Sequence, residues 1–165
     1  MCLYEAERKV LMSGDHLLFD ITPNIMPWPT NIMPWPNRED SLGMYLASLD
    51  KIRDLDVELV LPGHRNVGQH HRARIAQLKN HHQARLDEVL RSLQNGEKTA
   101  YEIAPLLSWD IESKPWATLP AIQKWFAFSE TLAHLRHLEK RGKVRKCFRM
   151  AKAYYSLPQT FILDK

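Results

Sequence analysis

Short apolar runs separated by polar stretches dominate the first part of the chain, and their periods predict strands and one helix. Residues 2–4 and 9–13 flank a short polar segment, which is typical of the two strands of a hairpin. Apolar side chains across residues 42–52 recur at spacings of three and four, which predicts an amphipathic helix. Residues 57–61 are mostly apolar and are followed by a Pro-Gly pair, which predicts a buried strand. A few strands and one helix leave one sheet face and one edge uncovered, so we expect this part to dimerise, exchange strands or be unstable.

A longer helical pattern covers residues 68–94, with apolar side chains along one side and Asn95-Gly96 as a left-handed end. Its other side carries basic residues and histidines. Adjacent helix residues point about 100° apart, so neighbouring histidines chelate one ion poorly. We therefore expect mostly solvated surface, with adventitious metal binding, at four positions: His70, His71, His81 and His82.

The last third of the chain predicts three short helices and a hairpin. Thr99 and Glu102 have the spacing of a capping box, which begins a short helix. Apolar residues in 122–128 and 132–138 predict two further helices with a turn near Ser129. Apolar residues in 144–150 and 154–157 then predict the two strands of a β-hairpin. Three helices followed by a hairpin is the winged-helix layout.

The segment between the first hairpin and the first helix contains Asn-Ile-Met-Pro-Trp-Pro twice, at residues 24–29 and 31–36. Its prolines exclude a helix or a central strand and predict an extended loop. One interpretation is a flap that places Trp28 and Trp35 beside a substrate. The interpretation that we favour is that one copy packs on the body while the other is a tolerated surface insertion. If exposed, these residues would promote self-association.

Composition restricts the class of protein without naming a function. The chain has 165 residues, of which 44% are hydrophobic and 25% charged, as in an ordinary globular protein. No apolar run approaches the roughly 20 residues of a membrane span, and no signal-peptide pattern begins the chain, so we expect a cytoplasmic protein without membrane contact. The two cysteines, Cys2 and Cys147, have no metal-binding spacing and are expected to be free thiols.

Candidate chemistry lies in two glycine turns, each directly after an apolar run. The first is Gly14-Asp15 within Ser13–Leu18, and the second is Gly63-His64 within Leu61–His64. Glycine permits a sharp turn, and the following Asp or His can bind a metal or move a proton. Each turn by itself is weak evidence, because Asp and His after glycine are common turn residues.

Together, in this order and about fifty residues apart, these turns resemble the last two metal-ligand motifs of the metallo-β-lactamase superfamily of hydrolases, in its glyoxalase II-like and endoribonuclease-like branch. The resemblance implies an α/β fold: the C-terminal half of a metallo-β-lactamase-type αβ/βα sandwich, followed by a small winged-helix domain. The implied boundaries are a catalytic part, a connecting helix and the winged helix at residues 1–72, 73–95 and 96–165.

The resemblance also implies a site with two zinc ions, in which Asp15 bridges the ions and His64 holds the second. The family's other ligands come from an upstream His-x-His-x-Asp-His stretch and a further histidine, and that stretch does not occur in this sequence. We therefore expect a C-terminal fragment or truncated product of a zinc hydrolase, with weak or absent zinc binding, no complete catalytic set and no activity alone. The intact protein would act on a thioester, ester or phosphodiester in a small molecule or RNA.

The alternative function is a nucleic-acid-binding or interaction module. Net charge is only +4, but the stretch from Lys140 to Lys152 has seven basic residues and no acidic one. Such a segment can contact phosphates, or it can simply solvate a hairpin that packs on the catalytic part. The preceding helix offers few side chains that read bases, which disfavours sequence-specific DNA binding. The candidate nucleic-acid contacts are Lys143, Arg145, Lys146 and Arg149.

Overall fold

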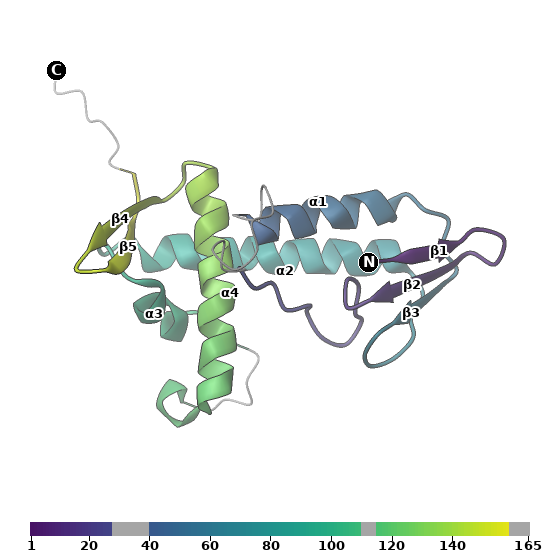
Figure 1. Cartoon of the computed structure of the whole chain (residues 1–165), viewed down its shortest axis with the longest axis horizontal. Helices are drawn as coiled ribbons and strands as arrows, with labels where there is room; N and C mark the ends of the chain where they lie inside the picture. The colour runs from purple at the N-terminus through teal and green to yellow at the C-terminus, as the bar shows by residue number, and fades with distance from the viewer. Residues whose placement is uncertain (28–39, 110–114, 159–165) are drawn as a thin grey trace, which may run out of the picture. The chain divides into compact units, whose positions relative to one another are not determined.

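The computed structural model divides the chain into two compact units. The structure describes residues 1–27, 40–109 and 115–158. The first unit comprises residues 1–24 and 43–83, and the second comprises residues 25–42 and 84–165. Figure 1 shows the elements of both units. The repeat tryptophans Trp28 and Trp35 lie outside the described residues.

The first unit is built on a three-stranded sheet with the order β1-β2-β3 (Figure 1). Strands β1 (Leu3–Glu5) and β2 (Val10–Gly14) are antiparallel, and β3 (Leu59–Pro62) pairs with β2 in parallel. The predicted hairpin and third strand are thus confirmed, although β3 begins two residues later than expected. Parallel pairing requires a crossover between the two strands, and helix α1 (Ser41–Arg53) lies within it.

The two faces of this sheet differ in exposure. Leu11 and Val60, which pair across β2 and β3, are buried. Leu3, Met12 and Leu61 form the next row of the ladder and are 54%, 40% and 37% exposed. The two rows differ in exposure because successive side chains of a strand point to opposite faces of the sheet. The uncovered apolar row agrees with the expected unpartnered face, while oligomerisation stays a prediction.

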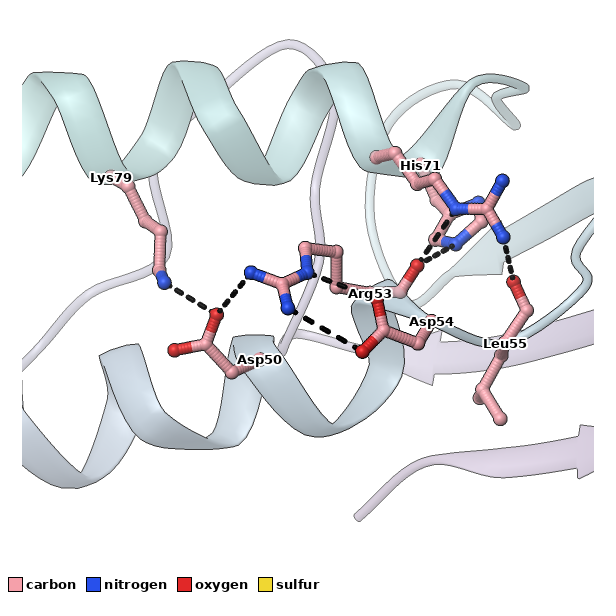
Figure 2. Close-up of polar contacts among 7 residues, drawn as sticks. Asp50, Arg53, Asp54, Leu55, His71 and Lys79 are labelled. Atoms are coloured by element: carbon pink, nitrogen blue, oxygen red, sulfur yellow. Dashed lines mark hydrogen bonds and ion pairs between the residues drawn. The ribbon is translucent and has the colours of Figure 1, made fainter.

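The N-terminus of helix α2 (His71–Ser92) lies beside the C-terminus of α1, and polar contacts within the first unit join these two helix ends. The carbonyl oxygen of Arg53 accepts hydrogen bonds from the side chains of His71, at 3.1 Å, and Arg72, at 3.0 Å (Figure 2). A second connection is the ion pair of Lys79 with Asp50, 2.5 Å long. Carbonyl groups at a helix C-terminus lack partners within the helix, so these donors satisfy an otherwise open end of α1.

The expectation of a solvated histidine surface within residues 68–94 is wrong for two of the four positions. His71 is 3% exposed because it packs against the end of α1, and His82 is 1% exposed. The ring of Tyr45 meets His82 edge-on, with 5.7 Å between the ring centroids. His81 is half-buried, and His70 is exposed as expected. Both buried histidines therefore belong to the packed interior.

The second unit contains the end of α2, a short helix α3 (Ala100–Ile103), helix α4 (Ala121–Lys140) and the hairpin β4 (Arg145–Arg149) and β5 (Lys152–Ser156). Two 3₁₀ turns, η1 (Ala104–Leu106) and η2 (Trp116–Thr118), lie between α3 and α4. The capping box is confirmed: Thr99 Oγ1 accepts the Glu102 N–H, and Glu102 accepts the Thr99 N–H at 2.8 Å. The hairpin is confirmed as well.

The predicted turn near Ser129 is wrong, because α4 continues through it as one helix. Its interior contains neither glycine nor proline, and Ser129 itself is buried. The Thr131 hydroxyl donates to the Ala127 carbonyl oxygen at 2.8 Å, which satisfies a polar group without breaking the helix. The second unit consequently has one long helix where two were expected.

Helix α4 also buries polar positions that a base-reading helix would need at its surface. Thr131, His134 and His137 are all at most 1% exposed. His134 Nδ1 lies 2.8 Å from the Glu130 carbonyl oxygen, and His137 Nδ1 lies 2.8 Å from Asp40 Oδ1. These side chains are therefore part of the core of the second unit.

Candidate metal centre

Strands β2 and β3 bring the two glycine turns together at the same edge of the sheet. Their register pairs Gly14 with Pro62, and the Gly63 N–H donates to the Gly14 carbonyl oxygen at 2.9 Å. Gly14 has φ +52°, a left-handed conformation that favours glycine. Because β2 and β3 are parallel, the residue after each strand end emerges on the same side.

Asp15 and His64 meet directly at this edge. His64 Nδ1 lies 2.6 Å from Asp15 Oδ1, although the two residues are 49 positions apart in sequence. Both side chains are 67% exposed. The two residues predicted from the resemblance as metal ligands are thus neighbours, and both are accessible from solvent.

Gly63 makes this approach possible. A Cβ atom at position 63 would lie only 2.9 Å from Asp15 Oδ1 and 3.3 Å from the Gly14 carbonyl carbon. Any larger residue would therefore push the carboxylate or the Gly14 turn aside. The glycine before His64 has a steric role at the site as well as a role in the turn.

Buried hydrogen bonds hold the Asp15 turn in place. Ser13 is 0% exposed, and its hydroxyl donates to the Leu17 carbonyl oxygen at 2.8 Å. The His16 N–H donates to the Ser13 carbonyl oxygen at 3.0 Å, closing the turn around Asp15. These contacts fix the backbone on both sides of a carboxylate that is itself exposed.

A second link between the two loops was not anticipated from sequence. The backbone N–H and the side-chain amide of Asn66 both donate to Asp20 Oδ2, at 3.1 and 3.2 Å. Asp20 follows the first turn and Asn66 follows the second, so the link ties the loops together beyond the Asp15–His64 contact. The only sequence signal was an Asp and an Asn in adjacent loops, which is too common to be specific.

His16 lies next to Asp15 in sequence but belongs to a different environment. Its ring meets Tyr45 edge-on with centroids 5.3 Å apart, and the Tyr45 hydroxyl donates to the His16 carbonyl oxygen at 3.2 Å. Burial lowers the pKa of His16 below its ordinary value near 6.5. The neutral form is therefore favoured, which suits a packing role.

The types of ligand at the Asp15–His64 edge fit zinc, but their number does not complete a site. Carboxylate and imidazole are common zinc ligands, and a catalytic zinc has about three protein ligands. Within the described residues, no third histidine, cysteine or acidic side chain groups with this pair. Two ligand atoms on one tetrahedral zinc lie roughly 3.3 Å apart. The 2.6 Å separation is shorter, so the pair is hydrogen-bonded and would have to open slightly around an ion.

Three of the predicted nucleic-acid residues lie on β4, and they are divided between its two faces. On β4, Arg145 and Arg149 share one face and Lys146 lies on the other, because side chains alternate along a strand. Lys146 pairs with Glu139 at 3.2 Å, and Arg149 pairs with Glu97. In the described part of the chain, Lys143 and Arg145 make no ion pair. Two of the four cations are thus already partly neutralised.

Comparison with known proteins shows a sequence similarity in the first part of the chain. Residues 1–64 match the family model described as Metallo-beta-lactamase superfamily, and this stretch includes both Asp15 and His64. No curated protein matches the chain significantly.

The two cysteines, Cys2 and Cys147, are free thiols, as expected from the sequence.

Two solved structures are similar over almost the entire chain. A beta-lactamase domain protein from Burkholderia ambifaria is 31% identical, with a TM-score of 0.80 over 94% of this chain and 43% of that one. A metallo-beta-lactamase family protein from Thermus thermophilus is 33% identical, with a TM-score of 0.71 over 93% of this chain and 44% of that one. This chain therefore spans less than half the length of either structure.

None of the helices in the described ranges is long and apolar enough to cross a membrane. Over residues 1–64 by sequence, and over most of its length by its mixed α/β fold, the chain is similar to part of a metallo-β-lactamase superfamily domain.

Proposed function

We propose that Asp15 and His64 supply part of the metal centre of a zinc-dependent hydrolase whose remaining ligands come from another polypeptide segment. The observation that carries this proposal is the 2.6 Å contact between a carboxylate and an imidazole at adjoining strand ends, within the stretch that matches the superfamily. The absence of a third ligand among the described residues supports an incomplete site. By itself, the chain holds zinc weakly and does not hydrolyse substrate.

The chemistry follows from the donor set. Zinc bound at such a site lowers the pKa of a coordinated water and polarises a carbonyl or phosphoryl group. Asp15 offers a carboxylate that can bridge two ions, and His64 offers an imidazole nitrogen. The buried Ser13 hydroxyl bond and the Gly63 turn hold these ligands in position. The substrate class that we propose for the intact protein is a thioester, ester or phosphodiester, in a small molecule or RNA.

The ligand role is tested by titrating the purified chain with zinc, in parallel with the variant Asp15→Ala/His64→Ala. We expect the unmodified chain to bind zinc about tenfold more tightly than the double variant, yet to lose it on dialysis. The control is His70→Ala, which removes an exposed histidine outside the pair and should leave the zinc affinity unchanged. Elemental analysis after dialysis measures the zinc that remains.

Two results would contradict the proposal. Equal zinc affinity in the unmodified chain and the double variant would exclude Asp15 and His64 as ligands. About one zinc per chain retained through dialysis, together with metal-dependent hydrolysis, would show that the chain completes the site itself, so the requirement for another segment would be wrong.

The alternative proposal is that the second unit is a winged helix that binds nucleic acid through the hairpin. The geometry supports this alternative less well. Helix α4 buries Thr131, His134 and His137, and Lys146 and Arg149 are engaged in ion pairs. A salt-dependent shift of labelled RNA that disappears in the triple variant Arg145→Ala/Lys146→Ala/Arg149→Ala would favour it.

A further inference from the structure

The second unit contains a pocket that is separate from the Asp15–His64 edge. It is lined by residues of α3, α4 and the β4–β5 hairpin, and its volume is about 570 Å³. Pockets for small-molecule ligands typically measure about 300–1,000 Å³. We call it the α3–β5 pocket. Its size suits one small organic molecule.

Aromatic rings from several elements line the α3–β5 pocket. Tyr101 of α3 is 61% exposed and Phe148 of β4 is 70% exposed, while Tyr155 of β5 is buried. Exposed rings that line an open pocket offer flat surface on which a planar ligand can stack. The backbone bridge between Lys98 and Tyr155, with hydrogen bonds of 2.9 and 2.8 Å, connects the segment before α3 to the hairpin.

The charged groups of the pocket are mostly basic. Arg136, Lys146 and Lys152 line it, with Glu102 as the acidic residue among the lining side chains. Lys146 is paired with Glu139. In the described ranges, the side chains of Arg136 and Lys152 make neither a hydrogen bond nor an ion pair, so their charge is available to a ligand.

Glu102 offsets only part of this charge, because it is one carboxylate among three basic side chains. One of its oxygens accepts the Thr99 backbone N–H and the Thr99 hydroxyl, both at 2.8 Å. The hydrogen bond from the Thr99 backbone is the main reason that the pKa of Glu102 is lowered, and the charge of Lys152 lowers it further. The pocket thus combines flat apolar walls with an excess of positive charge.

We propose that the α3–β5 pocket binds a nucleoside phosphate, either as a free nucleotide or as the terminal nucleotide of a single strand. The base would stack between Tyr101 and Phe148, and the phosphate would be held by Arg136 and Lys152. Aromatic stacking together with basic groups is the combination that binds single nucleotides without reading their sequence. A bare anion would leave the rings uncovered, and an uncharged ring would leave both cations without a partner.

Isothermal titration calorimetry of the full chain with AMP tests this proposal, in metal-free buffer so that the Asp15–His64 edge is not involved. We expect saturable binding of one AMP per chain. Phe148→Ala should weaken it about tenfold, through loss of stacking, and Lys152→Gln roughly fivefold, through loss of a phosphate contact. Adenosine and inorganic phosphate should each bind at least tenfold more weakly than AMP.

Matched variants outside the pocket make the comparison specific. Arg145→Gln removes the same charge from the opposite face of β4, and Ile122→Ala removes an apolar side chain that is 57% exposed on α4. Both should bind AMP like the unmodified chain, and far-ultraviolet circular dichroism checks that every variant is folded. A short oligoadenylate distinguishes the two sources of the ligand: tighter binding than AMP indicates a strand end, and equal or weaker binding a free nucleotide.

Three results would overturn the proposal. One is no binding of AMP at millimolar concentration. Another is that Arg145→Gln weakens binding as much as Lys152→Gln, which would indicate a general charge effect. The last is that phosphate or adenosine binds as tightly as AMP. The basic side chains or the aromatic rings would then bind their ligand without help from the other group. None of these results bears on zinc binding, so the two proposals fail independently.

Discussion

The molecule contains a histidine–aspartate pair in each unit, and the two pairs differ mainly in their access to water. In the first unit, His64 and Asp15 are 2.6 Å apart and 67% exposed. In the second unit, His137 and Asp40 are 2.8 Å apart, with side chains 2% and 12% exposed. The same chemical groups at nearly the same distance are therefore accessible to solvent in one unit and buried in the other.

Burial decides which role each pair can have. Exposed charges are screened by water and contribute little stability, but they remain open to an incoming ion. A buried pair excludes ligands, and losing one member removes a hydrogen bond of the other that water cannot readily replace. The contrast teaches that a His–Asp contact alone is no evidence of a site, whereas a contact at exposed strand ends is a candidate.

The largest expected effect on stability comes from removing the histidine of the buried pair. His137→Ala should lower the free energy of unfolding by about 3 kcal/mol, because it opens a cavity in the core and removes one buried hydrogen-bond partner of Asp40. The exposed counterpart, His64→Ala, should change it by less than about 0.5 kcal/mol. Urea unfolding of both variants measures the difference. Equal losses would mean that burial does not separate the two pairs.

An intermediate effect is expected from Gly63→Ala, which alters the exposed pair through its backbone. The added Cβ would lie 2.9 Å from Asp15 Oδ1, so we expect a loss of about 1 kcal/mol of stability and separation of Asp15 from His64. Combining it with Asp15→Ala removes the clashing carboxylate and should recover part of the loss. Urea unfolding of the two single variants and the double variant gives the coupling, and strictly additive losses would exclude the clash.

The smallest effect concerns His16, which is intermediate in burial between the two pairs. Burial lowers its pKa in the folded chain below the value near 6.5 expected for an unfolded chain. The unfolded state therefore binds the proton more readily, and stability falls as the pH decreases from 6.5 through the lower folded pKa. In urea unfolding at pH 7.5 and 5.5, His16→Gln should lose less stability than the unmodified chain between the two values. The same loss in both would show that His16 does not contribute to the pH dependence.

Local elements of the fold could be predicted because their signals are local. The hairpin of β1 and β2 follows from two apolar runs around a polar segment, and α1 from apolar spacings of three and four. The capping box at Thr99 needs only four residues to be recognised. Each of these features depends on backbone geometry and on side chains a few positions apart, so distant residues do not alter it.

The errors concern polar residues whose partners lie far away or within a helix backbone. Periodicity suggested a turn at Ser129, yet Thr131 donates to the backbone of its own helix and α4 continues. The polar side of the helix predicts an exposed His71, but its side chain donates to a carbonyl group at the end of α1. No pattern within a single helix indicates that a neighbouring element will supply a hydrogen-bond acceptor.

The candidate site depends both on local sequence and on tertiary structure. From the sequence alone came the two glycine turns, the residue types at positions 15 and 64, and the strands that precede them, because turns and strands depend on neighbouring residues. Only the tertiary structure decided that His64 lies beside Asp15 and His137 beside Asp40, contacts that span 49 and 97 positions. Such contacts, and the burial that separates a structural pair from an accessible one, depend on how distant segments pack together, which is a property of the whole chain.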